Sequence, residues 1–287
     1  MISNMNDGTA AAPYLRLDIS DGNLELPASS SLPADLRSRY AAIRSAGFRG
    51  IQGGDPALCA EFQLRRTGSF RVNKPEEAEE QTRRSRDTGE ECATLHVGWG
   101  MESDVEIYLL IDAILNASAK HNHPLYVETH RATVTQDLYR AVELTKRHPG
   151  IRFNGDFSHW YTGLEMVYGS LNEKQAFIAP VLERVRFLHG RIGNPGCIQV
   201  HIGDTMEEAL SRSYVQHFMQ LWIDSMRGFL RAAQPGDFLI FAPELLPSRI
   251  FYARTLPDGR EESDRWRQAQ LLAQIALRCF AEAHKPL

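Results

Sequence analysis

Eight β-like segments alternate with helical segments along this chain, and no other feature of the sequence restricts the fold as much. Period-2 apolar patterns such as YLRLDIS predict strands, whereas apolar residues three and four positions apart predict helices. The predicted strands are Tyr14–Ser20, Phe48–Gly53, Ser69–Asn73, Cys92–Val97, Pro124–Thr129, Ile151–Phe157, Val185–Gly190 and Asp237–Glu244. The helices between and after them are predicted at about 35–46, 56–66, 75–86, 103–120, 135–148, 174–184, 214–233 and 264–283.

Strands that are separated by helices pair in parallel through right-handed crossovers, and eight such units close most simply into a (β/α)8 TIM barrel, an α/β fold. Glycines are expected at helix ends, where a left-handed residue is favoured: Gly47, Gly68, Gly89, Gly150 and Gly236. A doubly wound open sheet is the rival fold. It normally has a glycine-rich loop after the first strand, and Asp21-Gly22-Asn23 does not provide that loop.

The 287 residues therefore divide into a flexible N-terminal tail, residues 1–13, and a single barrel domain with a C-terminal helix, residues 14–287. Two long loops, residues 161–172 and 193–212, are expected to lie near the mouth of the barrel. The 43% of hydrophobic residues exclude disorder over most of the chain.

The charge balance argues against several partners. The formal net charge is -4, and duplex-binding proteins usually carry a basic excess, so nucleic acid is not the expected partner. No apolar run is long enough to span a bilayer, and the first residues lack the features of a secretory signal. The four cysteines form no C-x-x-C pair, which favours reduced thiols and a cytoplasmic protein.

Four consecutive predicted strands end in residues that can ligate a metal. They are Glu128, Asp156, His189 and Glu244. The carboxyl ends of barrel strands meet at one mouth, and three carboxylates placed there repel one another unless a cation lies between them. This mixed oxygen and nitrogen donor set predicts one divalent ion, with Mn, Mg, Co and Zn left open. Each residue also has an ordinary structural interpretation, a helix N-cap for a carboxylate or a core position for His189.

The order Glu128-x-His130, Asp156-x-x-His159, His189 and Glu244 resembles the xylose isomerase-like TIM barrel superfamily over roughly residues 91–247. That superfamily includes sugar isomerases, ketose 3-epimerases, inosose dehydratases and apurinic/apyrimidinic (AP) endonucleases of family 2. The resemblance implies that Glu128, Asp156, His189 and Glu244 ligate the metal. It also implies that Glu128 and Glu244 act as the catalytic acid/base pair, and that His159 holds a substrate hydroxyl or carbonyl.

Further side chains near the strand ends are predicted to contact the substrate: His96, Trp99, His130, Trp160, Arg191 and His201. The tryptophans could stack on a sugar or pack loops, and Arg191 could hold a substrate oxygen or form a surface ion pair. The endonuclease branch has an additional Asp-x-His pair of zinc ligands. Here Gln199 replaces its Asp while His201 remains, so a single-metal site is expected.

The resulting hypothesis is a metal-dependent isomerase or epimerase of a small polyhydroxy carbonyl compound, working through an enediolate in carbohydrate metabolism. A dehydratase or lyase acting on an inosose-like substrate is the main alternative. An AP endonuclease and a non-catalytic sugar-binding barrel come after it. A homodimer or homotetramer is compatible with the sequence.

Overall fold

The computed structural model describes residues 4–26 and 30–285 of the chain. Its parallel strands are β2 (Tyr14–Ser20), β3 (Gly50–Gln52), β4 (Arg65–Val72), β5 (Ala93–Val97), β6 (Leu125–Glu128), β7 (Phe153–Gly155), β8 (Val185–Gly190) and β9 (Asp237–Pro243). They pair in sequence order, and β9 also pairs with β2 in parallel, at Tyr14 opposite Phe238. The sheet is therefore a closed eight-stranded barrel, which confirms the predicted fold class.

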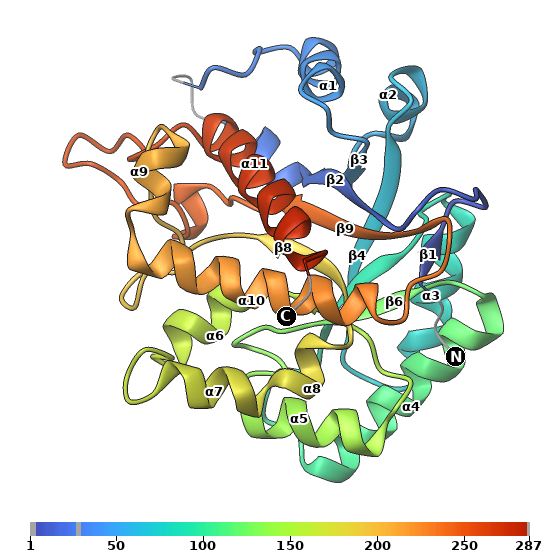
Figure 1. Cartoon of the computed structure of the whole chain (residues 1–287). Helices are drawn as coiled ribbons and strands as arrows, with labels where there is room; N and C mark the ends of the chain where they lie inside the picture. Colours follow the sequence, from blue (N-terminus) through green and yellow to red (C-terminus); the bar gives the residue numbers. More distant parts are fainter. Residues whose placement is uncertain (1–3, 27–29, 286–287) are drawn as a thin grey trace.

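Helices surround this barrel (Figure 1). They are α1 (Leu36–Ser45), α2 (Pro56–Glu61), α3 (Glu77–Asp87), α4 (Asp104–His121), α5 (Leu138–Arg147), α6 (Phe157–Gly163), α7 (Leu171–Phe177), α8 (Ala179–Leu182), α9 (Met206–Leu210), α10 (Ser213–Leu230) and α11 (Arg265–Ala283). Short 3-10 helices lie at Asp21–Leu24 and Ser248–Ile250. No helix of the described residues is both long and apolar enough to cross a membrane.

Local sequence explains several helix ends. Ser103 and Glu106 form a capping box at the start of α4, and Asn122 closes that helix with φ 47°. The predicted helix at 174–184 is instead two short helices, α7 and α8, with Pro180 in the first turn of the second.

The region between α2 and β4 departs from the prediction. The helix expected at 56–66 ends at Glu61, and Gln63 has φ 54°, which helical residues do not adopt. Strand β4 therefore begins at Arg65, four residues before the predicted Ser69. Gly68 consequently lies inside this strand and not at a helix end.

Part of the segment expected to be a tail is paired with the barrel. Met5–Asn6 form β1, which runs antiparallel to the first residues of β9. The carboxylate of Asp237 accepts hydrogen bonds from the side-chain amides of Asn4 and Asn6, at 2.8 and 2.7 Å. These bonds, and the burial of Met5, explain why the segment is ordered; residues 1–3 lie outside the described part of the chain.

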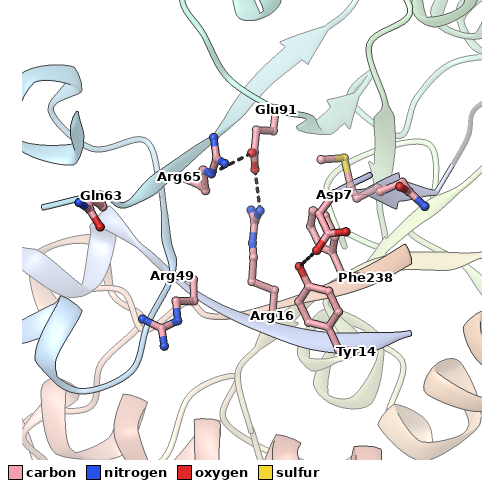
Figure 2. A pocket seen from close by; sticks show the side chains of 10 residues that line it. Asp7, Tyr14, Arg16, Arg49, Gln63, Arg65, Glu91 and Phe238 are labelled. Carbon is pink, nitrogen blue, oxygen red and sulfur yellow. Dashed lines mark hydrogen bonds and ion pairs between the residues drawn. The ribbon is translucent and has the colours of Figure 1, made fainter. Parts of the chain in front are cut away.

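β1 lies beside a hollow of about 490 Å³ at the amino ends of the strands (Figure 2). Its lining includes Tyr14 and Arg16 from β2, and Arg65 and Glu91 near β4 and β5. None of the four predicted metal ligands lines this hollow, because they lie at or just beyond the carboxyl ends of their strands.

The interior of the barrel changes from apolar to polar along its axis. A small apolar cluster fills the part near β1: Met5, Cys92, Tyr126, Phe187, Phe238, Ile240 and Ala242. Towards the carboxyl ends the buried residues are polar and include Gln52, Thr94, Glu128, Asn154 and His189. A larger apolar core lies between the barrel and its helices. The polar end of the interior is where a functional site can form, since buried polar groups need partners.

Candidate metal and active site

The four predicted ligands lie together at the carboxyl end of the barrel. One ligand atom from each of Glu128, Asp156, His189 and Glu244 lies within 4.8 Å of the others. Glu128 ends β6, Asp156 follows β7, His189 lies in β8 and Glu244 follows β9. The first three are almost completely buried, whereas the Glu244 side chain is 17% exposed.

His189 is oriented by a hydrogen bond on the side away from the carboxylates. Its Nε2 lies 2.8 Å from Oε1 of Gln52, an amide oxygen that can only accept a hydrogen bond. In the neutral ring, Nδ1 therefore has the lone pair, and the side-chain amide nitrogen of Asn154 lies 3.0 Å from it. Nδ1 lies 3.5 Å from Glu128 Oε2, 3.5 Å from Glu244 Oε2 and 3.9 Å from Asp156 Oδ2. Such an outer hydrogen bond is typical of a metal-ligating histidine.

Asp156 combines a structural role with a place in the site. It is the N-cap of α6, where its Oδ1 accepts hydrogen bonds from the backbone N–H and the hydroxyl of Ser158. Oδ2 is left to face His189 and Arg191. The capping interpretation and the ligand interpretation of this residue are therefore compatible, because each uses a different oxygen.

Glu128 is held from two sides. The Asn154 amide donates to Glu128 Oε2 at 3.1 Å, and His96 Nε2 lies 3.3 Å from Oε1. Burial works to raise the pKa of Glu128, but His189 and His96 outweigh it and keep this pKa well below its ordinary value. Glu128 is accordingly an ionised carboxylate.

The pKa of Glu244 is shifted in the opposite direction. Burial is the largest influence and raises the pKa of Glu244, while His189 and Arg191 offset only part of that effect. Burial would lower the pKa of His189, but Glu244, Glu128 and Asp156 raise it to about 9. Two carboxyl groups whose pKa values move in opposite directions can serve as a base and an acid.

Arg191 lies inside the ligand cluster and not at the surface. The side chain is 1% exposed, its Nη2 contacts Asp156 Oδ2, and the same nitrogen donates to Glu244 Oε2 at 2.7 Å. Its Nε donates to Ser158 Oγ at 3.0 Å. The surface ion pair considered from the sequence is therefore a buried one.

The donor set is chemically suited to a divalent ion. With Arg191 protonated and His189 neutral, three ionised carboxylates leave a net charge of about −2, which one divalent cation offsets. The lone pair on His189 Nδ1 can supply a nitrogen donor in place of its contact with the Asn154 amide. Glu128, Asp156, His189 and Glu244 are thus the residues that could hold the ion.

Three histidines form a row beside the cluster. The ring centroids of His96 and His130 are 4.4 Å apart, and those of His130 and His159 are 3.8 Å apart. Nδ1 of His130 accepts the backbone N–H of Ala132, so its Nε2 is the protonated nitrogen. Burial lowers the pKa of His130 to about 4 and lowers that of His159 well below its ordinary value. Both rings are neutral, and His130 can donate a hydrogen bond without carrying charge.

His96, Glu128 and His130 also form a second group with metal-ligand spacing. The hydrogen bond from Ala132 argues against an ion there, because the Nε2 of His130 then carries a proton instead of a lone pair.

The two predicted stacking tryptophans have different environments. Trp99 is 53% exposed, and the guanidinium of Arg71 lies 4.1 Å from its ring centre. Trp160 is completely buried in the main core, and its indole N–H donates to the carbonyl of Thr135 at 2.7 Å. α6 begins directly after Asp156, which turns Trp160 towards the core and leaves no ring face for a substrate.

His201 lies outside both groups of possible metal ligands. Its backbone N–H donates to Glu262, and neighbouring Gln199 exchanges two hydrogen bonds with the backbone of Leu246. Gln199 therefore links the loop after β8 to the segment after β9.

Sequence reasoning did not single out two residues of the site. Asn154 is the middle residue of β7, whose three residues are all buried, and its amide contacts Glu128. Tyr252 comes from the irregular segment after β9, and Arg191 lies 4.7 Å from its ring centre. No periodic pattern marks that segment, so nothing in the sequence pointed to Tyr252.

No protein-family model matches the chain, and no curated protein sequence matches it either. Solved structures do match. The probable 3-DHS dehydratase AsbF involved in petrobactin synthesis from Bacillus anthracis has a TM-score of 0.54 at 14% identity, covering 92% of this chain and 98% of that one. A D-tagatose 3-epimerase-like protein has a TM-score of 0.52 at 12% identity, covering 93% and 98%.

A xylose isomerase domain protein from Planctomyces limnophilus has a TM-score of 0.50 at 14% identity, covering 96% of this chain and 98% of that one. The chain thus shares its (β/α)8 barrel fold with these proteins. At these identities the likeness concerns the fold, and the chemistry has to be argued from the site.

Proposed function

We propose that this protein is a divalent-metal-dependent isomerase or epimerase of a small polyhydroxy carbonyl compound. One observation carries the proposal: Glu128, Asp156, His189 and Glu244 each place one ligand atom within 4.8 Å of the others at the carboxyl end of the barrel. A bound divalent ion supplies a Lewis acid that polarises a carbonyl oxygen. Glu128, Asp156, His189 and Glu244 would hold it.

The protein's own residues would then move the proton. Ionised Glu128 takes a proton from the carbon next to the substrate carbonyl, which leaves an enediolate. Glu244, the second member of the proposed acid/base pair, is the group that returns a proton. Neutral His130 can donate its Nε2–H to a substrate oxygen, and His159, in van der Waals contact with it, lines the same wall. Exposed Trp99, with Arg71 over its ring, could cover an apolar sugar face.

A dehydratase is the second candidate, because one of the proteins with this fold is a probable 3-DHS dehydratase. Both reactions begin with removal of a proton next to a carbonyl. Incubation of the protein and MnCl2 with a panel of ketoses and cyclic keto-polyols in D2O tests both. Deuterium incorporation at constant heavy-atom composition supports an isomerase or epimerase, and loss of water supports a dehydratase. If neither occurs with any substrate of the panel, and Glu128→Gln leaves ligand affinity unchanged, the sugar-binding alternative is favoured.

An endonuclease is disfavoured by the same residues. It would need further zinc ligands, but Gln199 is engaged with Leu246 and His201 lies outside the clusters. The net charge of -4 also gives no support for binding nucleic acid. A small-molecule substrate, a cytoplasmic location and a homodimer or homotetramer remain part of the proposal.

A further inference from the structure

The guanidinium of Arg191 contacts two of the four side chains that could hold a divalent ion. Its Nη2 contacts Asp156 Oδ2 and lies 2.7 Å from Glu244 Oε2. Those two oxygens are the atoms of Asp156 and Glu244 that face Nδ1 of His189. Two of the four donor atoms available to an ion are therefore already bonded to a cation of the protein itself.

The surroundings of Arg191 keep the guanidinium in this position. Ser158 accepts a hydrogen bond from its Nε, and the ring of Tyr252 covers its guanidinium carbon at 4.7 Å. Nη1 is buried and has no hydrogen-bond partner among residues 4–26 and 30–285, which is a costly arrangement for a charged group. The contacts of Nη2 with Asp156 and Glu244 therefore hold the guanidinium in place despite the unfavourable burial of Nη1.

We infer that Arg191 is a resident counter-ion that competes with the divalent ion for Asp156 and Glu244. It keeps the carboxylate cluster paired when no ion is bound, and it lowers the affinity for the ion. The inference rests on the proposed function, since it presupposes that the four donors bind a metal. The guanidinium and a divalent ion that share carboxylate oxygens in a buried site repel each other strongly.

Titration of chelator-treated protein with MnCl2 by calorimetry tests the inference. Arg191→Met removes the charge and keeps much of the side-chain volume, whereas Arg191→Lys keeps the charge. We expect Arg191→Met to bind Mn2+ about tenfold or more tightly than the wild type, and Arg191→Lys to stay close to the wild type. Arg249→Met is the matched control, because Arg249 is an exposed arginine paired with Glu25.

Thermal unfolding gives a second readout. Without metal, Arg191→Met should unfold at a lower temperature than the wild type, because Asp156 and Glu244 lose their arginine. MnCl2 should then raise its Tm more than it raises that of the wild type. Equal or weaker Mn2+ affinity in Arg191→Met would overturn the inference while leaving the proposed function intact. Absence of Mn2+ binding in the wild type and in both Arg191 variants would instead contradict the metal-dependent function.

If Arg191→Met does not fold, the wild-type protein still provides a test. The 15N signal of the Arg191 Nε, assigned with the Arg191→Lys variant, should shift when diamagnetic ZnCl2 is added, because the bonds of Nη2 to Asp156 and Glu244 are rearranged. Zinc binding without any change of that signal would contradict the competition.

Discussion

His189 and Gln52 are joined across the polar end of the barrel by a hydrogen bond of 2.8 Å between Nε2 and Oε1. The bond connects β8 to β3, two strands that are not neighbours in the sheet. It fixes the proton on Nε2 of the neutral ring and leaves Nδ1 directed at the three carboxylates. The ability of His189 to ligate a metal therefore depends on a residue that contributes no ligand itself.

Replacing Gln52 should accordingly weaken metal binding. We expect Gln52→Leu to lower the Mn2+ affinity by about 10–100-fold, the usual effect of losing a partner behind a ligating histidine. Calorimetric titration measures it. Gln220→Leu, at an exposed position of α10, is the control and should bind as the wild type does. Unchanged affinity in Gln52→Leu would show that the ring needs no such orientation.

The metal-free protein should lose stability at alkaline pH. The pKa of His189 is raised in the folded state from 6.5 to about 9, mainly by Glu244 and Glu128 acting against burial. A raised folded-state pKa adds stability that is complete below the unfolded pKa and is lost as pH rises through the folded value. The free energy of unfolding with EDTA present should therefore fall by up to about 3 kcal/mol between pH 6 and pH 9.5.

Urea unfolding at the two pH values checks this expectation, with His189→Gln as the comparison. The variant lacks the titrating group, so its stability should change less over the same range. A wild-type protein that is equally stable at both pH values would show that the carboxylates do not hold a proton on His189.

The two tryptophans should respond differently to truncation. Trp99→Ala removes a half-exposed ring near the row of histidines, so we expect KM to rise several-fold with little change in kcat or Tm. Trp160→Ala empties a buried core position and should lower the free energy of unfolding by about 3–5 kcal/mol. Steady-state kinetics and urea unfolding separate the effects. An unchanged KM in Trp99→Ala would remove Trp99 from the substrate site.

A second buried ion pair stabilises the barrel below the site. Arg16 donates to both carboxylate oxygens of Asp18, at 3.0 and 2.8 Å, and Asp18 is completely buried. Arg16→Met should cost about 3–5 kcal/mol of unfolding free energy, because it leaves the charge of Asp18 without a partner. Adding Asp18→Asn should restore much of that loss. If the double variant is no more stable than Arg16→Met, the charge of Asp18 is not what destabilises it.

Much of the fold could be predicted because the signals are local and repeated. Period-2 and helical patterns located all eight barrel strands, and the parallel topology then brought Glu128, Asp156, His189 and Glu244 to one mouth. Pairing of Met5–Asn6 with β9 could not be predicted, since a two-residue strand has no period and depends on partners more than 200 residues away.

Within the site, the limits of prediction have the same physical origin. Trp160 was expected at the mouth, but the N-cap at Asp156 begins a helix at once and rotates it into the core. Arg191 was expected to contact a substrate or the solvent. Its contact with Asp156 and Glu244 depends on three separate chain segments, which no short motif records.

Metal binding at the mouth of the barrel is best measured as the number of divalent ions bound per chain. Protein purified without chelator, equilibrated with MnCl2 and freed of excess ion, should contain about one Mn per chain by mass spectrometry of the metal. Glu128→Gln and Asp156→Asn should each lose most of it, because each removes a charged donor from the cluster. No bound ion in the wild type, an unchanged ion content in both variants, or three zinc ions per chain after equilibration with ZnCl2 would contradict the account.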